Sequence, residues 1–252
     1  MALALTLRSL EMATELALAH NLPHDMRSTD ARDLMRSLRF DQAPVMRRGR
    51  LAGWVRTATL TGRGSVEQHL TPLEDCAILA RDTPVSDAIK TVARHQLVFL
   101  AGAAGINAFV VTSDLDRHAV RCYLYVLVSE LEMYMASQAA ASLSAEQIEA
   151  HLGNQKKRYR QAQERGVETH PIEYLNFSAY EAVAPQVPAI VARFPGPNDN
   201  LAGELGKLKT LRDCVAHPSK SLTLDFEPTE LARLTQLAED FVAALQPETP
   251  AS

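Results

Sequence analysis

The spacing of hydrophobic and polar residues differs between the two halves of the chain. In the first half, short apolar runs bounded by turn residues predict strands, as at residues 43–46 and 98–101. In the second half, apolar residues recur every three or four positions over long stretches, which is typical of helices with one buried face. The pattern therefore predicts an α+β protein, in which small sheets with helices are followed by an all-α antiparallel bundle.

The N-terminal residues show a helical period. Leu3, Leu7, Leu10, Thr14 and Leu18 fall on one side, and charged residues interrupt the apolar run elsewhere. This spacing predicts an amphipathic packing helix over residues 3–20. The same charges distinguish the segment from the apolar core of a signal peptide.

The first half contains an internal repeat. Residues 38–60 align without gaps on residues 93–115 at a constant offset of 55. In each copy, at about residues 28–62 and 83–118, a short helix precedes a strand, a glycine-containing turn and a second strand. The second helix is expected to have Thr83 as its N-cap and Pro84 at its first position. Units of this size must pack together to bury their sheets.

This repeat resembles a pair of CBS domains, small modules that pair through their strands and commonly bind adenosine-containing nucleotides. The resemblance implies a CBS-like pair, with the N-terminal helix, over residues 1–118. In that family, a Thr or Ser is followed three residues later by an Asp that holds the ribose. Here the second copy has Thr112 and Asp114, so the hydroxyl is one residue too close, and the first copy has Thr59 in place of the Asp.

The resemblance therefore implies at most one nucleotide site, formed by Thr112 and Asp114 and suited to an AMP- or ATP-like regulatory ligand. A carboxylate suits a ribose because it can accept hydrogen bonds from both hydroxyls. Alternatively, Asp114 only caps the helix that follows it.

The helical half is predicted to form one domain over about residues 116–246. Apolar spacing predicts a helix of more than five turns from about residue 116 and a last helix over residues 227–245. Ser144 and Gln147 have the spacing of a capping box, which predicts a further helix running to Gly166. Residues 247–252 are expected to be a disordered tail.

The densest positive run of the chain lies in this further helix and includes Lys156, Lys157 and Arg158. A run of this kind attracts a phosphate backbone, so these residues are candidate RNA contacts. Alternatively, the run is only the solvated face of a helix.

The most distinctive stretch of the helical half places Arg212 and His217 with four residues between them. The leucine stripe before them predicts a helix with Asn200 as its N-cap. Because Pro218 disfavours the αR conformation in the residue before it, the helix should end near Ala216. His217 should then begin a turn, which frees its side chain to approach Arg212.

An antiparallel helical domain with Arg-x4-His, and with an Asp directly after the Arg, resembles the HEPN superfamily. Many HEPN proteins are metal-independent ribonucleases, in which two copies of the motif form one site across a two-fold axis. The resemblance implies a homodimer with Arg212, Asp213 and His217 in the catalytic site. Other members have lost catalysis and serve as regulators or binding modules.

The residue types suit RNA cleavage by the 2′-hydroxyl. His217 can transfer protons near neutral pH, Arg212 can stabilise the crowded phosphate, and Asp213 can hold Arg212. One His is too little for both a base and an acid, so the mechanism requires a dimer. Alternatively, Arg212 and His217 only stabilise a helix C-terminus through its dipole. The other histidines form no spaced cluster, so we expect neither a metal nor a catalytic cofactor.

Composition and charge limit the class of protein and the cellular compartment that we expect. The net charge of −4 and the pI near 6.1 exclude a strongly basic nucleic-acid binder but allow a local basic patch. Three distant cysteines suit a reducing compartment, and no apolar run approaches the roughly 18 residues of a membrane span, so we expect a cytoplasmic protein without a membrane partner. Two functions stay open. One is a ribonuclease gated by a nucleotide, and the other is a non-catalytic nucleotide-sensing module that regulates or binds a protein partner.

Overall fold

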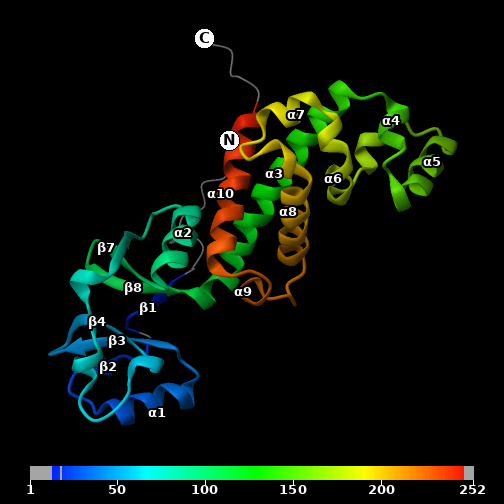
Figure 1. Cartoon of the computed structure of the whole chain (residues 1–252). Helices are drawn as coiled ribbons and strands as arrows, with labels where there is room; N and C mark the ends of the chain where they lie inside the picture. The colour runs from blue at the N-terminus through cyan, green and yellow to red at the C-terminus, as the bar shows by residue number, and fades with distance from the viewer. Residues whose placement is uncertain (1–12, 18, 247–252) are drawn as a thin grey trace. The chain divides into compact units, whose positions relative to one another are not determined.

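The computed structural model describes residues 13–17 and 19–246 (Figure 1). The chain divides into two compact units, one reaching Val120 and the other beginning at Arg121. The first unit combines helices and strands, whereas the described part of the second contains helices and turns without a strand. The predicted tail, residues 247–252, lies outside the described residues.

The first unit contains two copies of a helix–strand–strand element. The hairpin strands repeat at an offset of 55 residues, which confirms the repeat that the sequence predicted. Both hairpins also carry an irregularity at equivalent positions, between Val45 and Met46 in the first copy and between Leu100 and Ala101 in the second. The first copy consists of α1 (Ser28–Leu38), β3 (Gln42–Arg47) and β4 (Arg50–Arg56), and the second of α2 (Val85–His95), β7 (Leu97–Gly102) and β8 (Gly105–Val111).

Each hairpin is the centre of a four-stranded sheet, with one short strand on either side. One side strand is parallel to its neighbour and belongs to the same copy: β2 (Leu22–Pro23) beside β3, and β6 (Ala77–Ala80) beside β7. The other is antiparallel and is exchanged between the copies. β1 (Thr14–Glu15) precedes the first copy but pairs with β8, and β5 (Thr71–Pro72) precedes the second copy but pairs with β4. This exchange ties the two copies together.

The core of the first unit explains why the copies pack as a pair. In the first copy, Ala31 and Met35 of α1 belong to the same buried cluster as Val45 and Val55 of the sheet. A second cluster joins residues from both copies, including Trp54 of β4 with the buried side chains of Leu97, Phe99 and Phe109. Since neither sheet buries this surface alone, the hydrophobic effect favours the paired arrangement.

The exchanged strand β5 approaches β4 most closely at Gly53. This residue has φ +150°, and a Cβ atom built on it would clash with the backbone carbonyl of Thr71. Only glycine fits this position without a shift of the backbone. The equivalent residue of the second copy is Ala108, which pairs with Glu15 of β1.

The predicted N-terminal helix over residues 3–20 is wrong where the structure describes it. Residues 14–15 form β1, and Leu16 follows in a turn with its side chain buried. Residues 3–12 and residue 18 lie outside the described residues. The apolar spacing is helical, but β8 offers the backbone of β1 hydrogen-bond partners that the local sequence does not reveal.

Three long helices form the centre of the second unit: α3 (His118–Ser142), α8 (Leu201–Ala216) and α10 (Pro228–Leu245). They run alongside one another (Figure 1), and a Tyr123–Glu239 hydrogen bond joins α3 to α10. The helices predicted from about residue 116, before Arg212 and over residues 227–245 are thus confirmed. The shorter helices are α4 (Ala145–Glu149), α5 (Lys156–Glu164), α6 (Tyr180–Val183), α7 (Pro188–Arg193) and α9 (Leu222–Asp225).

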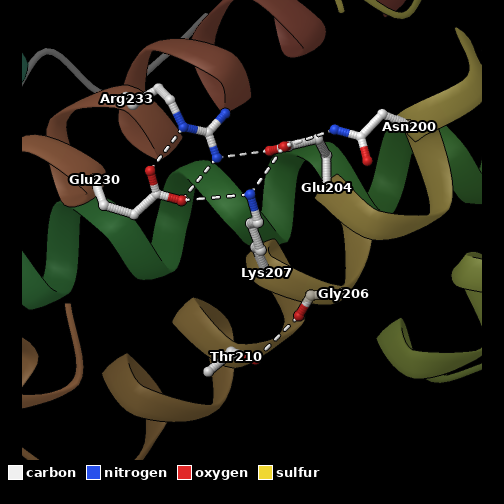
Figure 2. Close-up of polar contacts among 7 residues, drawn as sticks. All are labelled: Asn200, Glu204, Gly206, Lys207, Thr210, Glu230 and Arg233. Atoms are coloured by element: carbon white, nitrogen blue, oxygen red, sulfur yellow. Dashed lines mark hydrogen bonds and ion pairs between the residues drawn. The ribbon is translucent and has the colours of Figure 1, made fainter. Parts of the chain in front are cut away.

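A polar network joins the first half of α8 to α10 (Figure 2). Glu204 is buried, and its carboxylate accepts hydrogen bonds from Arg233 at 2.8 Å and from Lys207 and Asn200 at 3.1 Å each. Arg233 also donates to Glu230 at 2.8 Å, and this pairing lowers the pKa of the Glu230 carboxyl. A buried carboxylate is tolerated here because its oxygens are satisfied by hydrogen bonds and by positive charge.

Several helix boundaries differ from those predicted. Ser144 and Gln147 form the capping box, but the helix that they begin ends at Glu149, and a turn with Gly153 at φ +52° separates it from α5. Asn200 is the N-cap of α8 by position, yet its side chain bonds Glu204 rather than the backbone. Pro84, not Thr83, is the N-cap of α2. In the described part of the chain, no helix has both the length and the apolar composition needed to cross a membrane.

Candidate functional site

The first unit contains a cavity of about 410 Å³ at the end of β8, lined by residues from both copies of the repeat. The short 3-10 helix η4 (Thr112–Asp116) forms one wall, with both nucleotide-site candidates, Thr112 and Asp114. The end of α1 and the start of β3 contribute further lining residues, including Arg39 and Phe40. The cavity therefore brings the candidate residues of the second copy together with polar and aromatic groups of the first.

Asp114 is the most buried charged group of this cavity, with 5% of its surface exposed. One carboxylate oxygen accepts from the backbone N–H of Val111 at 2.8 Å, and the other pairs with Nε of Arg117 at 2.7 Å. Burial raises the pKa of the Asp114 carboxyl, and the contacts with Val111 and Arg117 oppose this shift. The carboxylate thus braces the backbone at the start of η4 while it lines the cavity.

The remaining polar groups of the cavity differ in how firmly they are held. Arg117 donates to the carbonyl of Ala13 at 3.1 Å and to the hydroxyl of Thr14 at 2.8 Å. The Thr112 hydroxyl makes only a long contact of 3.5 Å with the Gln96 carbonyl. Among the described residues, Arg39 has no side-chain hydrogen bond or ion pair, which leaves its charge available to a ligand.

Sequence reasoning missed Arg39, Phe40 and His20 as lining residues of this cavity. The rings of His20 and Phe40 lie 5.7 Å apart, centre to centre, and tilted against each other. No motif marks these residues, because they reach the cavity only through the pairing of the two copies. Arg39 is the C-cap of α1 and has φ +58°.

The equivalent region of the first copy has a different lining. Trp54, Arg56 and Thr59 stand where the second copy has Phe109, Val111 and Asp114. The guanidinium of Arg56 lies 5.4 Å from the centre of the Trp54 ring, a cation–π contact. The Thr59 hydroxyl donates to the Arg56 carbonyl at 2.9 Å. An arginine therefore lies over the aromatic ring, and Thr59 stands at the position that Asp114 has in the second copy.

In the second unit, Arg212 lies in the last turns of α8 and is partly exposed. It pairs with Asp213 at 3.5 Å, and Asp213 also accepts from Lys209 at 3.0 Å. Burial alone raises the pKa of Asp213, but the charges of Lys209 and Arg212 outweigh it and lower the pKa. Asp213 thus contacts Arg212, although Lys209 is its closer partner.

Glu132 of α3 is a further acidic neighbour of Arg212 that sequence reasoning missed. It is half-buried, and burial raises the pKa of its carboxyl, while the charge of Arg212 opposes the shift. Arg212 therefore interacts with two carboxylates, Glu132 and Asp213, of which only Asp213 is its neighbour in sequence.

His217 follows the last residue of α8, with the extended φ of −113° that Pro218 favours. This confirms the predicted end of the helix. Its imidazole is exposed, and no hydrogen bond or ion pair joins it to another described residue. The expected approach of His217 to Arg212 is thus not made through a hydrogen bond within one chain.

The turn that carries His217 is held by a buried arginine. Arg121 of α3, with 7% of its surface exposed, donates to the carbonyl of Cys214 at 3.1 Å and to the carbonyl of Lys220. Backbone bonds from the N–H of His217 to Cys214 and from Lys220 to the carbonyl of His217 complete the turn. Both ends of the His217 turn are therefore fixed to α3, whereas the imidazole makes no hydrogen bond or ion pair with the other described residues.

The basic run of α5 is largely engaged with its neighbours. Lys156 pairs with Glu149 at 3.3 Å, and Arg158 contacts Gln155 at 3.5 Å. Lys157 is exposed. In the part of the chain that the structure describes, no group of three His, Cys, Asp or Glu side chains could hold a metal ion.

Comparison with known proteins finds similarity to solved CBS-domain structures. The CBS-pair protein CBSX2 from Arabidopsis thaliana has 16% identity and a TM-score of 0.39, over 47% of this chain and 94% of that one. A CBS domain protein from Streptococcus pneumoniae has 11% identity and a TM-score of 0.39, over 47% and 84%. The CBS domain of a bacterial CNNM/CorC family Mg²⁺ transporter, in complex with ATP, has 17% identity and a TM-score of 0.37, over 43% and 86%. No family model matches the chain, and no curated protein matches it.

Proposed function

We propose that the first unit is a CBS-like pair that binds one adenine nucleotide, AMP- or ATP-like, and so regulates the helical unit. The proposal rests on the cavity of about 410 Å³ at the end of β8, which is lined in part by Asp114 and Thr112. A cavity of this size lies within the range of small-ligand sites.

The lining supplies a partner for each part of a nucleotide. The Asp114 carboxylate can accept from ribose hydroxyls, and the guanidinium of Arg39 suits a phosphate. The aromatic rings of Phe40 and His20 offer flat surfaces to a purine. Since Asp114 already holds the backbone of η4 through Val111, ligand binding there would act on the segment that leads into α3.

Calorimetric titration of the full chain with AMP and with ATP tests this proposal. We expect binding of at least one of them, with one site per chain. Asp114→Ala should weaken the affinity about 10–100-fold, because hydrogen bonds to a charged group contribute about 1.5–3 kcal/mol. Asp87→Ala, which removes an exposed carboxylate of α2 outside the cavity, is the matched control. Absence of heat with every adenine nucleotide would overturn the proposal.

A second candidate function is metal-independent RNA cleavage by a homodimer. It is favoured by the exposed imidazole of His217, carried on a turn that Arg121 fixes, with Arg212 on the helix before it. His217 would take the proton of the 2′-hydroxyl as that oxygen attacks phosphorus. His217 of the partner subunit would give a proton to the departing 5′-oxygen. Arg212 would stabilise the negative charge of the crowded phosphate.

The other residues have supporting parts in this scheme. Asp213 would hold the guanidinium of Arg212, and Lys156, Lys157 and Arg158 would guide the RNA backbone by their charge. The regulatory nucleotide would set the activity of the helical unit. Without catalysis, the same arrangement would serve a nucleotide-sensing module that binds a protein partner.

An RNA-cleavage assay in EDTA, with and without nucleotide, tests the second candidate, and light scattering tests for the dimer. His217→Ala should reduce the rate at least about 100-fold, since general acid–base catalysis contributes this much. His95→Ala, which removes an exposed histidine of the first unit, is the control. A wild-type protein that cleaves no RNA under any of these conditions would rule out the ribonuclease and leave the nucleotide-binding proposal standing.

A further inference from the structure

The tip of the β3–β4 hairpin carries three arginines among four residues: Arg47, Arg48 and Arg50, with Gly49 between them. Arg47 and Arg50 form the closing pair of the hairpin, and Arg48 and Gly49 are its turn. The three arginines are exposed. This tip is a dense local positive charge on a chain whose net charge is −4.

The hairpin does not need these arginines to form. The hairpin of the second copy closes in the equivalent register, through Gly102 and Gly105, with Ala103 and Ala104 in the turn. Its turn has a different conformation, since Gly105 rather than Ala103 or Ala104 has a positive φ, but it closes without a charge. A hairpin of this register therefore forms without arginines at its tip.

Arg48 occupies a conformation that costs energy. Its φ is +50°, and Gly49 follows with φ +76°, so both turn residues have the positive φ of a type I′ turn. Such turns prefer Gly or Asn at this position. At positive φ the Cβ atom of other residues lies too close to the following carbonyl oxygen, whereas Gly has no Cβ and the short Asn side chain can hydrogen-bond locally. A non-glycine residue kept in this region is a reason to look for a function.

The arginines border a wide, open hollow of about 1130 Å³. Arg47 is held by an ion pair with Glu67, which His24 also approaches at 3.7 Å. Among the described residues, nothing forms a hydrogen bond or ion pair with the side chains of Arg48 or Arg50. The guanidinium of Arg47 is thus held in place, and those of Arg48 and Arg50 stay available to a ligand.

The floor of the hollow is partly apolar, with Leu51, Leu70, Pro72 and Leu73 in its lining. Guanidinium groups bind phosphates, and apolar side chains can pack against the face of a base, so the lining offers partners for both parts of a nucleotide. An acidic peptide carries negative charge without flat bases beside it, so it matches the apolar part of this lining less well.

We propose that this hairpin tip and its hollow bind the phosphodiester backbone of a single-stranded nucleic acid. Arg48 and Arg50 contact phosphates, and bases rest on the apolar floor. The site is separate from the nucleotide cavity and uses neither Arg212 nor His217, so it goes beyond both proposed functions and can fail or hold without them.

Fluorescence anisotropy with a labelled single-stranded 2′-O-methyl RNA tests the proposal, because this RNA has no free 2′-hydroxyl and so measures binding without cleavage. We expect salt-dependent binding by the full chain. Arg48→Asn with Arg50→Gln should weaken it at least about 10-fold and reduce the slope of log K against log salt by about 1.4, since each phosphate contact contributes about 0.7. Asn keeps the turn conformation, so this variant should fold.

The matched control is Arg36→Ala with Arg94→Ala, which removes two positive charges from α1 and α2 outside the hollow. This pair should leave the affinity within about 3-fold of wild type, because nonspecific charge is screened over about 10 Å. Glu74→Gln should tighten binding, since it removes a negative charge from the lining. The proposal is overturned if the hairpin variant binds no more weakly than the control, or if polyglutamate competes as well as RNA of equal charge.

Discussion

In the two copies of the repeat, the hairpins β3–β4 and β7–β8 pair in the equivalent register and carry the same irregularity, yet the residues at their ends differ. The second copy places Asp114 beside a cavity, whereas the first has Thr59 and an arginine stacked on Trp54. The first copy has three arginines at its hairpin tip, whereas the second has none. The buried positions keep the backbone alike, and the exposed ends are free to take different chemistry.

The two copies also differ inside the fold. The exchanged strand β5 lies so close to β4 that only Gly53 fits, whereas its counterpart in the second copy, Ala108, has a side chain. The two sheets are therefore not interchangeable, even though their strands correspond. The single tryptophan, Trp54, lies in the first copy and gives a fluorescence signal for the first unit alone.

The largest effect is expected at this glycine. Gly53→Ala should lower the free energy of unfolding by about 2–4 kcal/mol, because the new Cβ clashes with Thr71 and strains the backbone. Ala108→Gly should cost only about 0.5–1 kcal/mol. Urea denaturation followed by Trp54 fluorescence measures both. Equal losses would show that the exchanged strands pack alike in the two copies.

Asp114→Asn is expected to weaken nucleotide binding about 10-fold or more. The amide is uncharged, and its nitrogen donates rather than accepts hydrogen bonds. Thr59→Asp should leave the stoichiometry at one nucleotide per chain, since Arg56 still lies over Trp54. Calorimetry measures both quantities. A stoichiometry of two in the wild type would contradict the assignment of a single open site.

A smaller effect is expected at the hairpin tips. Arg48→Asn should raise the free energy of unfolding by about 0.5–1 kcal/mol, because Asn tolerates positive φ better than Arg. Ala103→Asn in the second copy should bring no comparable gain, since Ala103 does not have a positive φ. The same urea experiment serves here. A loss of stability in Arg48→Asn would show that the arginine supports the turn.

The smallest effect is a pH dependence that only the second copy has. Burial raises the pKa of Asp114 above its ordinary 3.8, so the folded state binds its proton more tightly than the unfolded state does. The contribution of Asp114 to the free energy of unfolding should therefore increase as the pH falls through the raised pKa toward 3.8, and decrease as the pH rises. Comparing urea midpoints of wild type and Asp114→Asn from pH 7 to pH 4 measures this contribution. A contribution that improves with rising pH would contradict the sign.

The sequence predicted features that depend on local or repeated patterns. The offset of 55 located both hairpins, and Pro218 placed the end of α8 before His217. The capping box at Ser144 is present, but the length of its helix was wrong, because Gly153 turns the chain soon after it. Local signals such as the capping box and Pro218 mark single boundaries, but they do not show how far an element continues from a marked boundary.

Features that depend on distant partners were missed. β1 has two residues and becomes a strand only because β8 lies beside it. Its Thr14 pairs with Phe109, 95 positions further along the chain. Arg121 shows no motif, yet it holds both ends of the His217 turn. Arg39 and Phe40 line the cavity at the end of β8 together with residues of the second copy, which the sequence does not place beside them.

By itself, the sequence determined the repeat, the change from strands to helices and the identity of the candidate groups, because hydrophobic period and residue chemistry are local properties. The tertiary structure alone decided the exchange of β1 and β5, the opening of a cavity at Asp114 and the arginine-lined hollow beside β5. These depend on which surfaces meet when the copies pack, and one-dimensional spacing does not carry that information. The same holds for Arg212 and His217, whose spacing is local but whose chemistry depends on the groups that face them in space.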